Sequence, residues 1–106
     1  MSDNLLKNKL AQGEAAIGPF VNLSSGALIE IAAYAGFDFV ILDTEHGPLD
    51  IPTCEDLCRV AHGVGITPIV RIRENDAAQV LRALDIGAGG VQVPQICTKA
   101  DAEAVV

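Results

Sequence analysis

The chain has 106 residues, half of them hydrophobic, and its formal net charge is −7. This length and apolar content suit one folded domain and exclude global disorder, which needs low hydrophobicity. The negative charge disfavours partners with a phosphate backbone or an anionic membrane surface. No apolar run approaches the ~20 residues that span a bilayer, and the polar N-terminal stretch lacks the apolar centre of a secretory signal. We therefore expect a cytoplasmic protein without nucleic-acid or membrane partners.

A short apolar run, a polar turn and a helix-like segment recur along the chain about every 25 residues. The first unit is a strand over residues 17–23, followed by a capping pair of serines and a helix over residues 26–34. The second is an almost continuous apolar strand over residues 37–42, with a helix over residues 51–64. An uninterrupted apolar strand is typical of a parallel sheet covered on both faces.

Two further units follow in the second half of the chain. The third is a strand over residues 67–72 and a helix over residues 77–84, capped by Asp76 or the residue before it. The fourth is a strand over residues 90–93 and a helix over residues 99–106. This alternation predicts an α/β fold with parallel strands, and both the doubly wound sheet and the TIM barrel fit it. A barrel needs eight units and about 250 residues, so four units would form a half barrel with two open strand edges.

Polar residues follow the second and third strands, at the edge where parallel α/β folds bind ligands. Asp43, Glu45 and His46 come directly after the strand over residues 37–42. A carboxylate that orients an imidazole and raises its basicity makes a general base near neutral pH. Arg71 ends the neighbouring strand, where a guanidinium can bind a carboxylate or stabilise an oxyanion. The combination suits proton abstraction or C–C cleavage next to a carbonyl group.

The same residues also fit purely structural roles. A histidine beside acids, such as His46, is the pattern of a solvated ion pair in a loop. Arg71 fits a salt bridge at the rim of the sheet with Glu74 or Asp76. Arg73 lies two residues further on, beyond the strand, and fits the role of a solvated residue better than Arg71 does.

Two other motifs do not predict a site. Cys54, Cys58 and His62 lie at spacings of four on one helix face, but the first and third are about 12 Å apart, too far for one zinc ion. We interpret them as buried thiols and a helix-end histidine, and we expect all the cysteines, Cys97 included, to be reduced. The glycine-rich stretch 87–90 precedes a strand instead of opening a helix, so it is not a phosphate loop.

Several short segments follow one another in a fixed order from about residue 18 onward. They read NLSS at residues 22–25, AGFDF at 35–39, ILDTEHGP at 41–48, PIVR at 68–71, ND at 75–76, LDIGA at 84–88 and VPQ at 93–95. In this set the chain resembles the HpcH/HpaI aldolase family, metal-dependent pyruvate aldolases that act on 4-hydroxy-2-oxo acids.

The resemblance implies a (β/α)8 TIM barrel, of which residues 1–106 supply the N-terminal part of a single domain with about four βα units. It also implies a lyase that reversibly cleaves a 4-hydroxy-2-oxo acid to pyruvate and an aldehyde with a divalent ion, Mg, Mn or Co. The family's metal ligands, a Glu and an Asp, come from later strands that this chain does not contain, so no residue is assigned to the metal. We expect a homo-oligomer, and we expect the chain alone to be inactive, because a lost Lewis acid removes several kcal/mol of transition-state stabilisation.

The resemblance also implies roles for individual residues. His46 matches the catalytic base, and Asp43 matches its acidic partner. Arg71 matches the group that holds pyruvate and stabilises the oxyanion, while Glu45 would lie near the substrate and the metal's water shell. Asp85 matches an acid that raises the basicity of the histidine, although the sequence places it at the end of a helix.

Two alternatives to the aldolase interpretation stay open. The first is an acyl or CoA lyase of the same superfamily, like the citrate-lyase β-type proteins. The second is a half barrel without catalysis that pairs its open strand edges with another chain as an interaction module.

Overall fold

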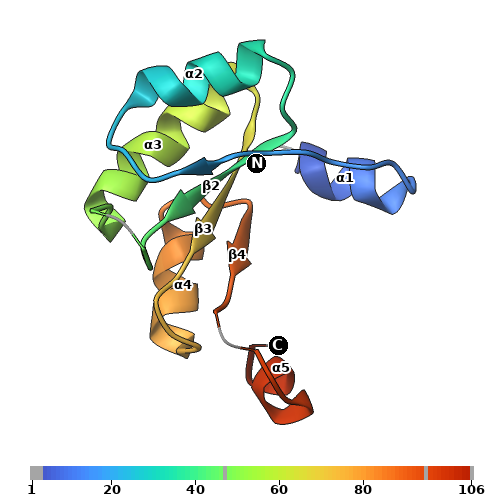
Figure 1. Ribbon diagram of the computed structural model, residues 1–106, viewed down its shortest axis with the longest axis vertical. Helices are drawn as coiled ribbons and strands as arrows, with labels where there is room; N and C mark the ends of the chain where they lie inside the picture. The colour runs from blue at the N-terminus through green and yellow to red at the C-terminus, as the bar shows by residue number, and fades with distance from the viewer. Residues whose placement is uncertain (1–3, 47, 95, 106) are drawn as a thin grey trace.

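A single parallel sheet forms the centre of the computed structural model, which describes residues 4–46, 48–94 and 96–105. Its strands lie in chain order and are all parallel (Figure 1). They are β1 (Phe20–Val21), β2 (Phe39–Asp43), β3 (Thr67–Arg71) and β4 (Gly90–Gln92). Because the order does not reverse within the sheet, this arrangement matches successive units of a barrel better than a doubly wound sheet.

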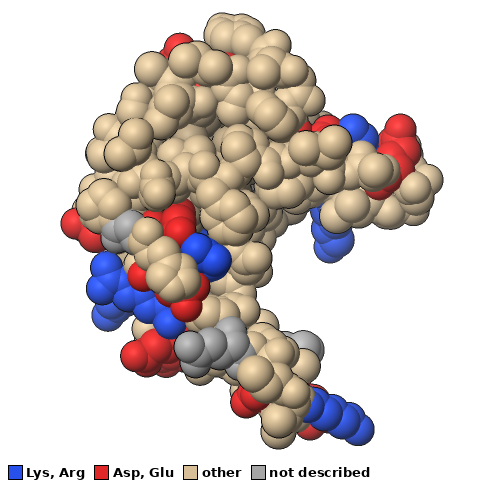
Figure 2. Space-filling model, viewed as in Figure 1, with Lys and Arg blue, Asp and Glu red and all other residues tan. Residues whose placement is uncertain are grey.

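Helices follow the strands and cover one face of the sheet, while the other face stays open (Figure 1). The helices are α1 (Leu5–Ala11), α2 (Gly26–Tyr34), α3 (Ile51–Val64), α4 (Ala77–Asp85) and α5 (Lys99–Val105). The packed face is formed by α2, α3 and α4, whereas α1 and α5 bury none of their described residues. In the space-filling view the molecule curves around a hollow between α1 and α5 (Figure 2).

The core lies between the covered face of the sheet and the helices. Alternate strand residues point toward the helices, which is why Val40 and Leu42 of β2 and Val70 of β3 are fully buried. Ile29 of α2 and Cys54 of α3 pack against them. Burying side chains of this size stabilises the fold by about 1.5–3 kcal/mol each, so this layer fixes where the strands end.

The predicted boundaries hold better for the inner elements than for the first strand. Helix α3 begins and ends where the sequence predicted, with Asp50 accepting a hydrogen bond from the Thr53 N–H and Pro52 in the first turn. The predicted strand 17–23 is wrong at both ends, because only Phe20–Val21 pairs with β2. Pro19 has no N–H to donate, and β1 is at the edge of the sheet, so few ladder bonds are available to extend it.

The cysteines are free, as expected, and they divide by burial. Cys54 and Cys58 lie inside α3, and burial raises the pKa of Cys54 to about 11 and that of Cys58 to about 12. The nearby His62 Nε2 lies 2.6 Å from the Gly87 carbonyl oxygen, which fixes the imidazole at the end of the helix. These thiols therefore stay protonated at neutral pH and act as small core residues.

Within the described part of the chain, no helix is long and apolar enough to cross a membrane.

Candidate active site

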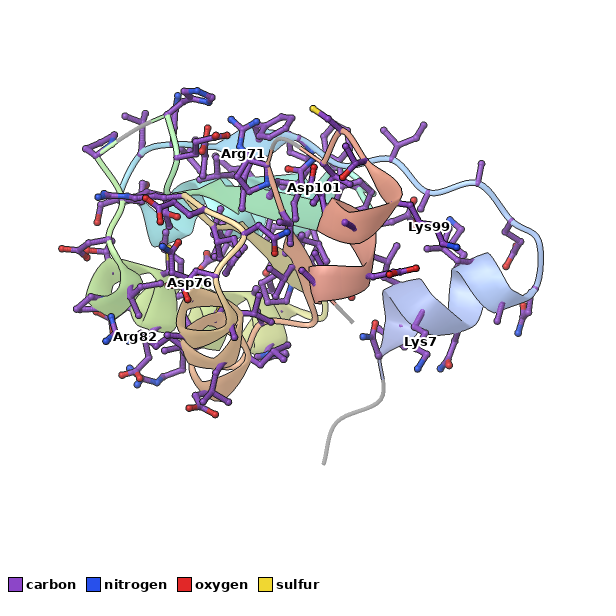
Figure 3. The ribbon with its side chains drawn as sticks, turned by 90° about the horizontal axis from the view of Figure 1, so that it is seen from below. Lys7, Arg71, Asp76, Arg82, Lys99 and Asp101 are labelled. Carbon is purple, nitrogen blue, oxygen red and sulfur yellow. The ribbon has the colours of Figure 1, made fainter. Side chains whose placement is uncertain are left out.

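The candidate site is the cluster formed by Asp43, Glu45, His46 and Arg71 at the carboxyl edge of the sheet. Strand register places Asp43 and Arg71 directly beside each other. Asp43, the last residue of β2, is paired with Arg71, the last residue of β3. Arg71 donates from Nε to Asp43 Oδ1 at 3.1 Å and from Nη2 to Asp43 Oδ2 at 2.6 Å. The pair is therefore bidentate, which fixes the plane of the guanidinium as well as its position. Figure 3 shows Arg71 on the open side of the sheet, away from α3 and α4.

The Asp43 carboxylate is buried and is held in its ionised form. Its side chain is 6% exposed, and Oδ1 also accepts hydrogen bonds from the N–H groups of Glu45 and His46, at 2.9 and 3.0 Å. The Arg71 guanidinium first, and these backbone donors second, lower the pKa of Asp43 to about 2 despite the opposing effect of burial. In return the carboxylate raises the pKa of Arg71, so both groups are charged at any physiological pH.

The His46 imidazole lies beside Arg71 of this pair and is exposed to solvent. Its Nδ1 is 3.0 Å from Arg71 Nη2 and 3.4 Å from Glu45 Oε1, and its side chain is 68% exposed. A guanidinium can only donate, so Nδ1 accepts in the contact with Arg71 and the proton of neutral His46 is on Nε2. When Glu45 is the partner instead, Nδ1 carries the proton and Nε2 is free to accept one. The two neighbours thus favour opposite tautomers.

The resemblance implies that Asp43 is the acidic partner of His46, but the Asp43 carboxylate makes no hydrogen bond to the imidazole. Asp43 reaches His46 only through the backbone N–H, because the bidentate contact with Arg71 takes both carboxylate oxygens. The carboxylate nearest to the imidazole is that of Glu45, whose Oε1 also lies 3.5 Å from Arg71 Nε. The four residues do lie together as the sequence predicted, but Asp43 positions the loop and the arginine instead of the ring.

Phe20 of this cluster was not predicted from the sequence, and Thr44 belonged to the predicted segment but had no role assigned to it. Phe20 of β1 lies under the guanidinium, with its ring centroid 4.7 Å from Arg71 Cζ, a cation–π contact that supports the charge from the open side. Thr44 is buried, and its Oγ1 donates to the Arg71 carbonyl oxygen at 2.6 Å. The signal for Thr44 was its place between Asp43 and Glu45, whereas nothing in the local sequence connects Phe20 with Arg71.

Asp85 is not brought to the cluster. It is the last residue of α4, it is exposed, and the chain runs from there into the start of β4. The cluster lies at the opposite edge, where β2 and β3 end. Within this chain, the role implied by the resemblance is therefore not supported by any contact.

The residues of the cluster do not make a metal site by themselves. Across residues 4–46, 48–94 and 96–105, no group of three His, Cys, Asp or Glu side chains is arranged to hold a metal ion. Asp43 is taken by Arg71, which leaves one carboxylate and one imidazole beside each other at Glu45 and His46. One carboxylate and one imidazole that already contact Arg71 do not form a metal-binding group in this part of the chain.

A hollow of about 590 Å³ lies at the other edge of the sheet, where the strands begin. It is lined by His62, Thr67, Leu84 and the glycines around Gly87, together with Asn4 before α1. The carboxylates and the guanidinium of the cluster are absent from its lining, and in parallel α/β folds this edge serves stability. The candidate site is therefore the edge of the sheet that contains Arg71, and not this hollow.

Four βα units in sequential order, with an acid, an imidazole and a guanidinium at the carboxyl edge, define this chain as part of a TIM-barrel-type α/β fold. The chain belongs to the HpcH/HpaI aldolase/citrate lyase family, whose sequence model matches residues 16–106.

Named relatives agree with this membership. The chain is 37% identical over 103 residues to a pyruvate aldolase of Rhizobium etli. The aligned residues make up 97% of this chain and 41% of that relative. The chain is 36% identical to a 5-keto-4-deoxy-D-glucarate aldolase of Escherichia coli, with 97% and 40% covered. The crystal structure of the citrate synthase SbnG matches with a TM-score of 0.91 at 34% identity, covering 98% of this chain and 42% of that one. The chain thus spans about two fifths of the length of the relatives it matches.

Proposed function

We propose that this chain provides the proton-transfer and anion-binding part of an aldolase site that cleaves a 4-hydroxy-2-oxo acid to pyruvate and an aldehyde. The observation that supports this most is the position of Arg71, which is anchored by Asp43 and has the His46 imidazole 3.0 Å from Nη2. The names of the relatives from Rhizobium etli and Escherichia coli point to the same class of substrate.

Arg71 is the group that would bind the 2-oxo acid. Arg71 donates from Nε and Nη2 to the Asp43 carboxylate, and within the described residues no acceptor contacts its Nη1. That nitrogen has two N–H groups left for the substrate carboxylate or for the oxygen on C2. Because Asp43 and Phe20 already hold the guanidinium in place, little reorganisation is needed when negative charge develops on that oxygen.

His46 is the group that would move the proton. In the cleavage direction, its free ring nitrogen accepts the proton of the C4 hydroxyl group, and the C3–C4 bond breaks. The bonding electrons pass to the enolate of pyruvate, and the aldehyde leaves. The protonated imidazole then returns the proton to C3 of the enolate, which completes pyruvate. Glu45, 3.4 Å from Nδ1, stabilises the imidazolium that exists between these two steps.

We also propose that the complete enzyme needs a divalent ion, Mg, Mn or Co, whose ligands lie outside the residues described here. Such an ion would polarise the 2-oxo group of the substrate. Treatment of the complete enzyme with EDTA should then abolish pyruvate release, and added Mn²⁺ should restore it. Full activity after exhaustive chelation would refute the metal requirement without affecting the role of His46.

The test of the base is a pair of histidine variants in a full-length protein that contains this chain. His46→Ala should lower kcat for pyruvate release from a 4-hydroxy-2-oxo acid by about 10²- to 10⁴-fold, the usual contribution of a general base. His62→Ala is the matched control, because it removes the other imidazole, which lies at the far edge of the sheet. Turnover by His46→Ala within twofold of the wild-type rate would exclude this mechanism.

The second candidate is C–C bond chemistry on a citrate-type tricarboxylate, which the similarity to citrate synthase SbnG favours. The same arginine and histidine would serve, because that reaction also passes through an enolate: the base removes a proton from the methyl group of the acetyl donor, the resulting enolate attacks the keto carbon of oxaloacetate, and Arg71 binds an oxaloacetate carboxylate. The two candidates differ in products. Incubation with a 4-hydroxy-2-oxo acid and, separately, with oxaloacetate and an acetyl donor distinguishes them by release of pyruvate or by formation of citrate.

A further inference from the structure

A second hollow, of about 270 Å³, lies at the carboxyl edge of the sheet but on its helix side. Figure 3 shows Arg82 and Asp76 on that side, with the sheet between them and Arg71. The hollow is bounded by the turn that starts α3, the end of β3 and the first turns of α4. Besides Asp50, its lining consists of Thr44, Ile51, Ile72, Arg73, Gln79 and Arg82.

The two arginines of this hollow differ from most other basic residues of the chain. Lys9, Arg59, Arg71 and Lys99 each have a carboxylate oxygen within 4 Å. Within the described residues, neither Arg73 nor Arg82 has such a partner, although the chain has a net charge of −7. Basic side chains do gather on this part of the surface (Figure 2, lower left). Two guanidinium groups therefore line one hollow without an ion pair of their own, and the acid of its lining is Asp50, whose pKa the hydrogen bonds with Thr53 and the charge of Arg73 lower.

The acids nearest to the hollow are engaged elsewhere. Asp50 lines it, but its carboxylate accepts the Thr53 N–H at 2.9 Å as the cap of α3. Asp76 caps α4 by accepting the Ala78 N–H at 3.2 Å. Caps of this kind are worth about 1 kcal/mol each, so withdrawing either acid to pair with an arginine would destabilise a helix. The hollow retains two positive charges against the single carboxylate of Asp50.

The donors of the hollow are held in place before any ligand arrives. Arg73 donates from Nε to the Thr44 carbonyl oxygen at 2.7 Å, and among the described residues no acceptor contacts its two terminal nitrogens. Gln79 Oε1 accepts the N–H groups of Arg73 and Glu74 at 3.0 and 3.2 Å, so its amide nitrogen is left as a donor. Ile51 and Ile72 form apolar walls, which strengthen charge-assisted hydrogen bonds beside them. Arg73 is exposed, as the sequence predicted, and it also makes this contact with the Thr44 backbone.

We propose that this hollow is a binding site for the carboxylate or phosphate group of a small metabolite, separate from the cluster around Arg71. Forked guanidinium donors and a side-chain amide are the groups that bind such oxyanions best. A volume of about 270 Å³ admits a small anion and excludes a large cofactor.

The hollow is connected by hydrogen bonds to the catalytic loop, the segment after β2 that carries Glu45 and His46. Arg73 holds the Thr44 carbonyl, and Thr44 lies between Asp43 and Glu45 and donates from Oγ1 to the Arg71 carbonyl oxygen at 2.6 Å. An anion that fixes the Arg73 guanidinium therefore also fixes the backbone on which Glu45 and Asp43 stand. Occupation of the hollow should thus order the catalytic loop.

The experiment titrates the full-length protein with inorganic phosphate and, separately, with malonate at constant ionic strength. The arginine Nε–Hε signals are followed in ¹H–¹⁵N spectra. We expect saturable shifts of the Arg73 and Arg82 signals with at least one of the two anions, and the one that saturates identifies the ligand as phosphate or carboxylate. Arg82→Gln should weaken that binding about tenfold or more, which corresponds to about 1.4 kcal/mol.

Arg59→Gln is the matched control, because it removes the same charge from the exposed face of α3, where Arg59 pairs with Glu55 and Asp56. It should leave the affinity unchanged. The Arg82 guanidinium makes no hydrogen bond within the described residues, and its carbonyl accepts the Ile86 N–H through the backbone alone, so the Arg82 variant tests binding even if Arg73→Gln fails to fold. Linear, unsaturable shifts with both anions, or an equal loss in Arg59→Gln and Arg82→Gln, would overturn the proposal.

Discussion

Asp43 determines the electrostatics of the candidate site more than any other residue. Its carboxylate accepts two hydrogen bonds from Arg71 and two from the backbone of the following loop. These contacts offset the desolvation of a buried charge, and they explain why the pKa of Asp43 falls to about 2. A carboxylate this acidic cannot exchange protons near neutral pH, so its function is to orient Arg71 and the loop that carries His46.

This pKa predicts how stability depends on pH. Because the pKa of Asp43 is lowered from 3.8 to about 2 on folding, the ionised carboxylate stabilises the fold fully above about pH 4. That stabilisation, about 2 kcal/mol, is lost as the pH falls through 2. Asp43→Asn should therefore be less stable than wild type at pH 6 by at least this amount, and the difference should shrink by about 2 kcal/mol toward pH 2. Urea unfolding at a series of pH values measures it.

Asp56→Asn is the control for this experiment, since Asp56 is an exposed carboxylate on α3 with 74% of its side chain accessible. Its free energy of unfolding should follow the wild-type curve across the same pH range. A constant difference between Asp43→Asn and wild type from pH 6 to pH 2 would show that the Arg71 pair does not stabilise the folded state.

The residues of the site were predictable from the sequence, but their pairing was not. Strand ends in a parallel sheet identify Asp43, Glu45, His46 and Arg71 as neighbours. Which acid faces the imidazole depends on the register of β2 against β3, and the register sets Asp43 opposite Arg71. A guanidinium beside a carboxylate forms the stronger contact, so the ring is left to Glu45.

At the scale of elements, the approach of β1 to β2 depends on a residue without a side chain. Gly18 lies just before β1, and a Cβ there would collide with the Phe39 carbonyl oxygen and lie 2.5 Å from its ring carbon Cδ2. Phe39 begins β2, which ends in Asp43, so a displacement at Gly18 would be transmitted along the strand that positions the site. Phe20, two residues after Gly18, also supports Arg71.

Two glycine variants test this contact. Gly18→Ala should lower the free energy of unfolding by about 1–3 kcal/mol, because the strand must move to admit a methyl group. Gly63→Ala should raise it by about 0.5–1 kcal/mol, since Gly63 lies in α3 with nothing within 4 Å of the added Cβ. Thermal and urea unfolding measure both. Equal effects of the two substitutions would mean that the space beside Phe39 is not restricted.

The elements were predicted well where burial and capping agree. Helix α3 has an apolar face, an acidic cap and a left-handed glycine at its end, Gly65 with φ of 80°, so its sequence pattern specifies both ends. Helix α1 was missed, because Asn4 caps a short helix that buries no residue and offers no periodic apolar face. Its anchors are the long-range contacts from Asn4 Nδ2 to the Gly89 carbonyl and from Lys9 to Asp38, which a local pattern does not contain.

For the whole molecule, the open face of the sheet is the dominant property. Strand register aligns Phe20, Ile41, Ile69 and Gly90 in one row across all the strands. Phe20 is 52% exposed, and Ile41 and Ile69 are only partly buried, although parallel sheets normally have both faces covered. In a closed barrel such a row forms one interior layer with side chains from the remaining strands. The chain therefore presents an interior surface to solvent.

We predict that the 106-residue chain by itself associates through this face. Its apparent mass in sedimentation should rise with concentration, and a hydrophobic dye should bind to it, because unpaired strand edges and apolar surface favour contact between copies. Phe20→Gln should reduce both effects. Ile31→Gln is the matched control, since Ile31 is 62% exposed on α2, on the helix side, and its replacement should leave association unchanged.

The form of the association separates the remaining interpretations of the half barrel. A dimer of constant mass with one cooperative melt would favour an interaction module that pairs its open face with a second copy. Open-ended growth would favour a chain whose interior layer is completed by further strands of the same barrel, because a surface that is not self-complementary gives no closed assembly. A monomer that binds no dye and is unaffected by Phe20→Gln would contradict the exposure of this face and, with it, the half-barrel interpretation.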